Sequence, residues 1–125
     1  NDQKISFAKK AIELYRGEFL PGYYDEWIEE MRSVLSHKYT ETVEILLSLL
    51  KKKNNYEELI NHSEKLLLTD KLHEEAFYYL IYAYKAIGNE TMAKKKFSQL
   101  LKNYDEEYGE KPPKELLNRI QSILV

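Results

Sequence analysis

The sequence predicts an all-α protein built from antiparallel helix pairs, with about six helices in all. Apolar residues recur at the three- and four-residue spacing of a helix face along nearly the whole chain. Strict alternation of apolar and polar residues is absent and β-branched residues are sparse, so strands are not expected. Glycine, proline and asparagine fall between the periodic segments, where they end one helix and begin the next.

The first two predicted helices are separated by a turn-rich stretch, LYRGEFLPGYYDEW. A helix ends at an Arg-Gly pair, a Pro-Gly turn follows, and Asp25 is placed to cap a long second helix. The stretch holds no histidine, serine or lysine, and its acids suit a helix cap or surface charge. We therefore predict a structural corner, and not a catalytic loop, at Arg16, Gly17, Pro21, Gly22 and Trp27.

The remaining helices are predicted from the signals at their ends. Asparagine or aspartate caps a helix start through its side-chain oxygen, and glycine closes a helix because it tolerates positive φ. Proline is tolerated in a first turn. The expected helix starts are Asn55 with Glu58 as its capping-box partner, Asp70, Asn89 and Pro112-Pro113, and the expected helix ends are Gly88 and Gly109.

Two stretches of the chain match when one is shifted by 34 residues. The matched pairs are Leu46 with Leu80, Leu47 with Ile81, Leu50 with Tyr84, Asn54 with Gly88, Leu59 with Ala93 and Leu66 with Leu100. This period and helix-turn-helix form resemble tetratricopeptide repeats, which stack in a right-handed sense. The first copy is the weaker one, with Ser63 where an aromatic residue is expected. We assign repeat-like units to about 40–73 and 74–107 and a capping helix to about 112–124.

A wider resemblance covers about Ala8 to Leu124. The stretch LYRGEFLPGYYDEW, the long helix after it, the repeat pair and EEYGEKPPKELLNRI resemble the bacterial transcriptional activator domain of antibiotic-regulatory-protein-type transcription factors. Tyr108 departs from the family pattern, in which a leucine is common. In that family the module usually follows an N-terminal winged-helix DNA-binding domain, sometimes with a receiver domain elsewhere. The resemblance implies a regulatory piece of a cytoplasmic transcription factor, in which a domain outside this chain binds DNA.

Composition and motifs exclude several other functions. A net charge of −2 gives no basic field for nucleic acid, and the apolar runs are too short to cross a membrane. The chain has no cysteine, and its three histidines lack metal-binding spacing. The lysine runs at 51–53 and 94–96 suit a helix end and a solvated face. We expect no catalytic residue, cofactor, metal or small-molecule ligand, and thus not an enzyme. Because the chain begins with Asn1, we expect it to be part of a longer protein.

Protein binding is the function that the repeat register favours. The tetratricopeptide resemblance implies that the first helix of each pair lines a concave surface. Tyrosine contributes ring area and a hydroxyl group to such surfaces. The predicted partner-binding groove consists of Glu44, Ser48, Lys51, Tyr78, Tyr82 and Lys85. Two interpretations stay open: the tyrosines contact a partner, or they pack against the last helix or the long one.

The expected partners are proteins: the chain's own DNA-binding domain, a second copy of the chain, or RNA polymerase. The alternative function is a stand-alone tetratricopeptide adaptor that binds peptides and has no link to transcription. A winged-helix sequence upstream of Asn1 in the reading frame would favour the regulator, and its absence would favour the adaptor.

Overall fold

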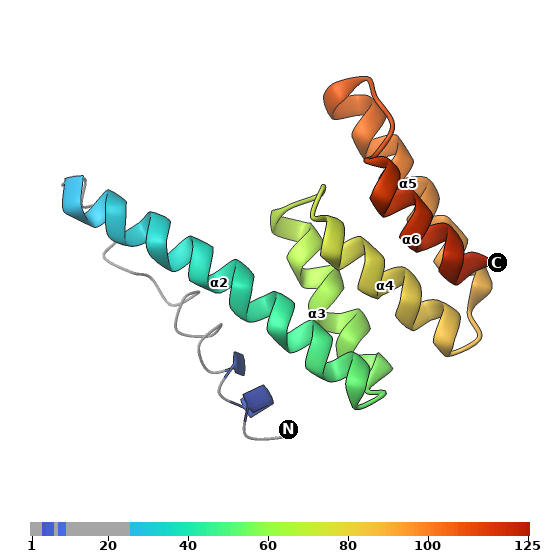
Figure 1. Ribbon diagram of the computed structural model, residues 1–125, viewed down its shortest axis with the longest axis horizontal. Helices are drawn as coiled ribbons and strands as arrows, with labels where there is room; N and C mark the ends of the chain where they lie inside the picture. The colour runs from blue at the N-terminus through green and yellow to red at the C-terminus, as the bar shows by residue number, and fades with distance from the viewer. Residues whose placement is uncertain (1–3, 7, 10–25) are drawn as a thin grey trace. The chain divides into compact units, whose positions relative to one another are not determined.

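The computed structural model describes residues 4–6, 8, 9 and 26–125, and it describes residues 26–32 and 35 by their backbone alone (Figure 1). These residues form helices and contain no strand, which confirms the predicted all-α, tetratricopeptide-like class. The chain divides into two compact units, Asn1–Leu49 and Leu50–Val125.

The first unit is described mainly by helix α2, Glu26–Lys52, whose last residues belong to the second unit. Val43, Leu46 and Leu47 are buried at helical spacing, whereas Ile45 is exposed. On the exposed side, Nε2 of His37 lies 2.9 Å from a carboxylate oxygen of Glu41 one turn later. The helix is therefore amphipathic, as its apolar spacing predicts.

The predicted corner lies almost entirely outside the described residues. Arg16, Gly17, Pro21 and Gly22 are in that part of the chain. Trp27 lies in the first turn of α2, where the backbone alone is described. The structural role of the corner stays a prediction.

The second unit contains four helices arranged around α4. They are α3, Tyr56–Thr69; α4, Glu74–Ala86; α5, Glu90–Tyr108; and α6, Lys114–Leu124. Helix α4 packs against α3, α5 and α6, and α5 also packs against α6. Short loops join consecutive helices, so that α3, α4 and α5 are antiparallel neighbours (Figure 1). Helix α4 is thus the element on which the other three helices of this unit depend.

One apolar cluster joins α4, α5 and α6. Its buried members are Phe77, Ile81, Ala93, Leu100, Tyr104, Leu116 and Ile120. Phe77 is only 1% exposed, and Leu100 and Ile120 are fully buried. The spacing of Leu116 and Ile120, four residues apart, gives α6 a single apolar face that covers the other two helices. The last predicted helix therefore closes this core.

Equivalent helix ends recur 34 residues apart. Asn54 and Gly88 both have positive φ, 56° and 82°, at the residue after a helix C-cap. The amide after each of them donates back to a helix carbonyl, that of Leu50 or Tyr84, at 2.9 Å in both cases. These are the bonds of a Schellman motif, in which an αL residue satisfies the last carbonyls. The shared geometry supports the proposed repeat register.

Most predicted helix starts match the structure, and one is wrong. The side chains of Asn55 and Asn89 accept bonds from the amides of Glu58 and Met92. Asp70, however, is the C-cap of α3 and accepts a bond from the Leu72 amide. The N-cap of α4 is His73, whose Nδ1 accepts from the Ala76 amide at 3.1 Å. Asp70 is used by the turn before the helix, so His73 takes the capping position.

The helix end predicted at Gly109 and the helix start predicted at Pro112-Pro113 match the structure. Gly109 ends α5 with φ of 63°, and its amide donates to the Asp105 carbonyl at 2.8 Å. Pro113 is the N-cap of α6, which begins at Lys114. Both features are set by residues whose own φ is suited to a helix end.

Replacing Ser63 with alanine is expected to stabilise the protein by about 1 kcal/mol. Ser63 on α3 is fully buried, and its hydroxyl has no hydrogen-bond partner among the described residues. The folded state therefore loses the hydration of this group without compensation. Urea unfolding of Ser63→Ala measures the gain, and Ser98→Ala on the exposed face of α5 controls for helix propensity. Equal gains from both variants would contradict the prediction.

Candidate functional site

A surface hollow of about 560 Å³ lies between α4 and α6. Both of the tyrosines predicted for the groove line it, and so does Lys85. Its full lining is Tyr78, Tyr82, Lys85, Ala86, Arg119, Ser122 and Ile123. We call this surface the α4–α6 hollow.

Tyr78, which lines the hollow, is held by groups from its own helix and from two others. The guanidinium carbon of Arg119, on α6, lies 4.1 Å from the centre of its ring. Lys51 Nζ, in the last turn of α2, donates to its hydroxyl at 3.3 Å. The ring of Tyr79 meets it edge-on at 5.2 Å between centroids. Tyr78 is thus half-buried and locked, and it also packs against the apolar core.

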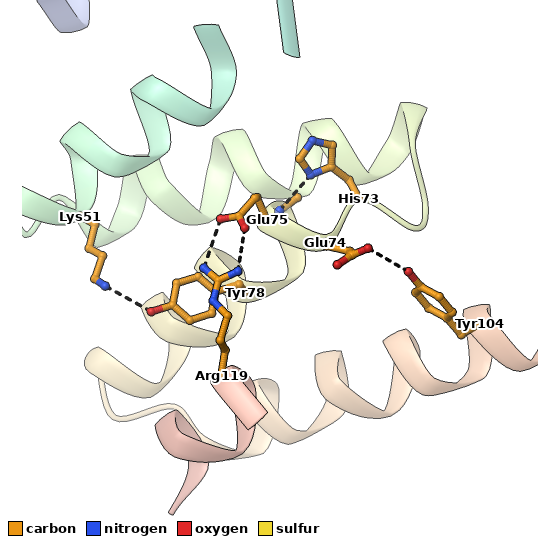
Figure 2. A network of polar contacts seen from close by, with 8 residues as sticks. Lys51, His73, Glu74, Glu75, Tyr78, Tyr104 and Arg119 are labelled. Carbon is orange, nitrogen blue, oxygen red and sulfur yellow. Dashed lines mark hydrogen bonds and ion pairs between the residues drawn. The ribbon is translucent and has the colours of Figure 1, made fainter. Parts of the chain in front are cut away.

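Arg119 joins α6 to α4 through a forked ion pair (Figure 2). Its Nη1 and Nη2 donate to the two carboxylate oxygens of Glu75 at 2.7 and 3.3 Å. The bond to Glu75 raises the pKa of Arg119 above its ordinary value, against the opposing effect of burial. A planar fork that binds a carboxylate and also stacks on a ring has a defined orientation. This contact therefore fixes the wall of the hollow.

Glu74 and Glu75 are adjacent in sequence, but their carboxylates bind side chains of two different helices. Glu75 binds Arg119 on α6, whereas Glu74 accepts a bond from the Tyr104 hydroxyl on α5 at 3.2 Å (Figure 2). Burial, followed by the charge of Glu74, raises the pKa of Tyr104 to about 12. The two carboxylates therefore stabilise helix packing and do not converge as an acid–base pair.

Tyr82 and Lys85 follow Tyr78 along α4 in the lining of the hollow. The Tyr82 ring stacks on Tyr78 at 6.3 Å between centroids, and Lys51 Nζ lies 4.4 Å from its centre. Lys85 is ion-paired with Glu90 at the start of α5, and this bond lowers the pKa of Glu90. The result is a tyrosine pair surrounded by cationic nitrogens.

The predicted groove is brought together in part. Lys51, Tyr78 and Tyr82 contact one another within Leu50–Val125, and Lys85 lines the same hollow as the two tyrosines. Glu44 and Ser48 are half-buried on α2 and belong to the other unit. The packing interpretation also applies to Tyr78, because Arg119 of the last helix covers its ring.

Sequence reasoning missed Arg119 and the role of Glu75. Their contact spans 44 residues and lies outside the repeat register. One signal was present: in KELLNRIQSIL the buried Leu116 and Ile120 define an apolar face, with Arg119 and Ile123 at its border. A border arginine of this kind can extend toward the neighbouring helix.

A second hollow of about 320 Å³ lies between α3 and α5. Lys96 lines this hollow and forms an ion pair with Glu64 at 2.9 Å. The prediction of a solvated face for residues 94–96 is therefore wrong for Lys96. Lys94 and Lys95 are exposed as expected. Buried Asn103 donates to the Lys71 carbonyl at 2.9 Å and so ties the α3–α4 turn to α5. These contacts hold α3 and the α3–α4 turn against α5.

Two tests for other kinds of site are negative within the described chain. The described His, Asp and Glu residues form no group of three that could hold a metal ion. Among the described helices, none has the length and apolar character needed to cross a membrane.

The fold defines a tetratricopeptide-like helical protein, with an aromatic and cationic hollow on one face of its second unit. The family model described as the bacterial transcriptional activator domain matches residues 2–124. The chain therefore belongs to the bacterial transcriptional activator domain family, which confirms the resemblance drawn from its motifs. This is a family of transcription-factor domains and not of enzymes. A comparison with curated proteins finds no match.

Proposed function

We propose that the chain is the regulatory protein–protein interaction domain of a multidomain bacterial transcriptional regulator. It couples a separate N-terminal winged-helix DNA-binding domain to a partner, to a second copy of the regulator or to RNA polymerase. Family membership supports the link to transcription. The regulator acts in the cytoplasm, where DNA and RNA polymerase are found.

The α4–α6 hollow is the observation that carries the interaction role. It presents two tyrosine rings next to Lys85 and Arg119. Tyrosine and arginine are enriched where proteins bind one another, because each combines a flat apolar surface with hydrogen-bond donors. The buried residues of α4 lie on its other faces, and the half-buried Tyr82 contacts the ring of Tyr56 on α3 at 6.3 Å between centroids.

The net charge of −2 supports a role for this chain in which a separate domain binds the DNA. Acids and bases are paired across the described surface, as in Lys85–Glu90, Lys96–Glu64 and Arg119–Glu75. Because acids and bases are interspersed, the chain has no net positive charge with which to attract phosphates, which dominate affinity for DNA. In this proposal, DNA is bound by the neighbouring domain.

The double variant Tyr82→Ala with Lys85→Gln in the complete regulator tests the proposal. We expect transcription from the target promoter to fall at least about fivefold, because interface tyrosines contribute on the order of 1–2 kcal/mol or more. Promoter binding and melting temperature should change little. The matched control is Lys94→Ala with Lys95→Gln, two exposed positions on α5. Normal transcription in the double variant would refute this role for the hollow, and a stand-alone adaptor would be one explanation.

A further inference from the structure

We infer that the α4–α6 hollow binds an acidic peptide segment of the partner, with one aromatic or leucine side chain between its acids. This inference rests on the proposed function and names the chemistry of the partner at the same site. The charge of the hollow, the apolar part of its lining and its rigidity support this inference.

The charge of the lining is positive. Lys85 and Arg119 both line the hollow, and none of the lining residues in the described part of the chain is acidic. Lys51 adds a third cation, over the Tyr82 ring. The side chains of Arg119 and Lys85 stay 43% and 28% exposed despite their ion pairs. A carboxylate in the hollow would therefore meet cations on two sides, whereas a basic segment would find no acid in the lining to pair with.

Both cations keep hydrogen-bond donors for a ligand. Arg119 carries five N–H groups, and its contacts with Glu75 use two of them among the described residues. The Lys85 ammonium carries three, of which the Glu90 contact uses one. The carboxylates of Glu75 and Glu90 thus orient the two cations without saturating them. A second carboxylate can complete each set of bonds.

Part of the lining of the hollow is apolar. Ala86 and Ile123 lie in it together with the two tyrosines. A volume of about 560 Å³ is in the range of ordinary ligand sites, about 300–1,000 Å³. An aromatic or leucine side chain would bury this surface, whereas a peptide of acidic residues alone would leave it exposed to water. The segment therefore needs an apolar anchor between its carboxylates.

The hollow is already in its binding geometry. Tyr78 is clamped by Arg119 and Lys51, and Arg119 is clamped by Glu75 (Figure 2). Because these side chains are ordered before a partner arrives, binding loses little side-chain entropy. Nucleic acid would fit the hollow less well, because binding of its phosphates requires a longer row of positive charges than Lys51, Lys85 and Arg119 provide.

Selection of peptides from a random phage-displayed library against this chain tests the inference. We expect the selected sequences to be rich in Asp and Glu around Phe, Tyr, Trp or Leu. A labelled selected peptide should then bind more weakly as salt is raised. Ser122→Glu, which adds an acid to the hollow, should weaken binding about fivefold, the factor that about 1 kcal/mol provides. Ser98→Glu, at an exposed position on α5, should not.

Lys85→Gln should likewise weaken binding, with the exposed Lys95→Gln as its control. Melting temperatures of the four variants separate lost binding from lost folding. A selection that enriches no sequences, or sequences without acids, overturns the inference, and so does equal binding by the Ser122 and Ser98 variants. If acidic peptides bind but substitution of Tyr82 and Lys85 leaves transcription unchanged, the inference stands and the proposed function fails. If transcription depends on these residues but acidic peptides do not bind, the reverse holds.

Discussion

Replacing Phe77 with alanine is expected to lower the free energy of unfolding by about 3–5 kcal/mol. Phe77 is 1% exposed, and its cluster joins α4 to apolar residues of α5 and α6. Truncation removes buried apolar surface and leaves a cavity that three packed helices cannot easily fill. Urea unfolding followed by circular dichroism measures the loss.

Tyr82→Ala is the matched control for Phe77→Ala, because it removes an aromatic ring from the same helix. Tyr82 is half-buried at the surface, so its truncation leaves no enclosed cavity. We expect this variant to cost less than about 2 kcal/mol. If Tyr82→Ala destabilises the fold as much as Phe77→Ala does, Tyr82 is a core residue and the α4–α6 hollow loses its main binding group.

Alkaline pH is expected to destabilise the protein through Tyr104. Its pKa is raised from 10.0 to about 12, first by burial and then by the charge of Glu74. Between these values the unfolded phenol loses its proton while the folded phenol keeps it. The stability that this group contributes is therefore complete below pH 10 and is lost as pH rises toward 12, by up to about 1.4 kcal/mol per pH unit.

Comparison with Tyr104→Phe isolates this effect from the titration of lysines. The variant loses the bond to Glu74, which should cost about 0.5–1.5 kcal/mol at neutral pH. Between about pH 9 and 11, its stability should then fall by about 1 kcal/mol less than that of the unmodified protein. Parallel losses in the two proteins would show that Tyr104 titrates normally in the folded state.

Helix ends were predictable from sequence because the groups that make them are close along the chain. Asn55 and Asn89 accept bonds from amides three residues later, and the φ of Gly109 follows from the residue itself. The repeat register also pairs Asn54 with Gly88, and both residues have positive φ. Local rules of this kind do not depend on the rest of the fold.

The start of α4 shows where local rules stop. Asp70 and His73 both lie before this helix, and both side chains accept a bond from a nearby amide. The turn between them is also tied to α5, because Asn103 donates to the Lys71 carbonyl. A contact 32 residues away thus takes part in holding the turn in which Asp70 binds Leu72 and His73 caps the helix. No local pattern contains that information.

By itself the sequence determined the helical class, the family motifs and most helix ends, because periodicity and capping are local properties. Through the repeat register it also predicted a groove that includes Lys51, Tyr78, Tyr82 and Lys85, and the binding role of this groove stays a prediction. Only the tertiary structure decided that Arg119 covers Tyr78 and that Glu75 binds Arg119. The physical reason is that an ion pair between helices depends on how those helices pack, and their packing is set by the buried residues that α4, α5 and α6 share.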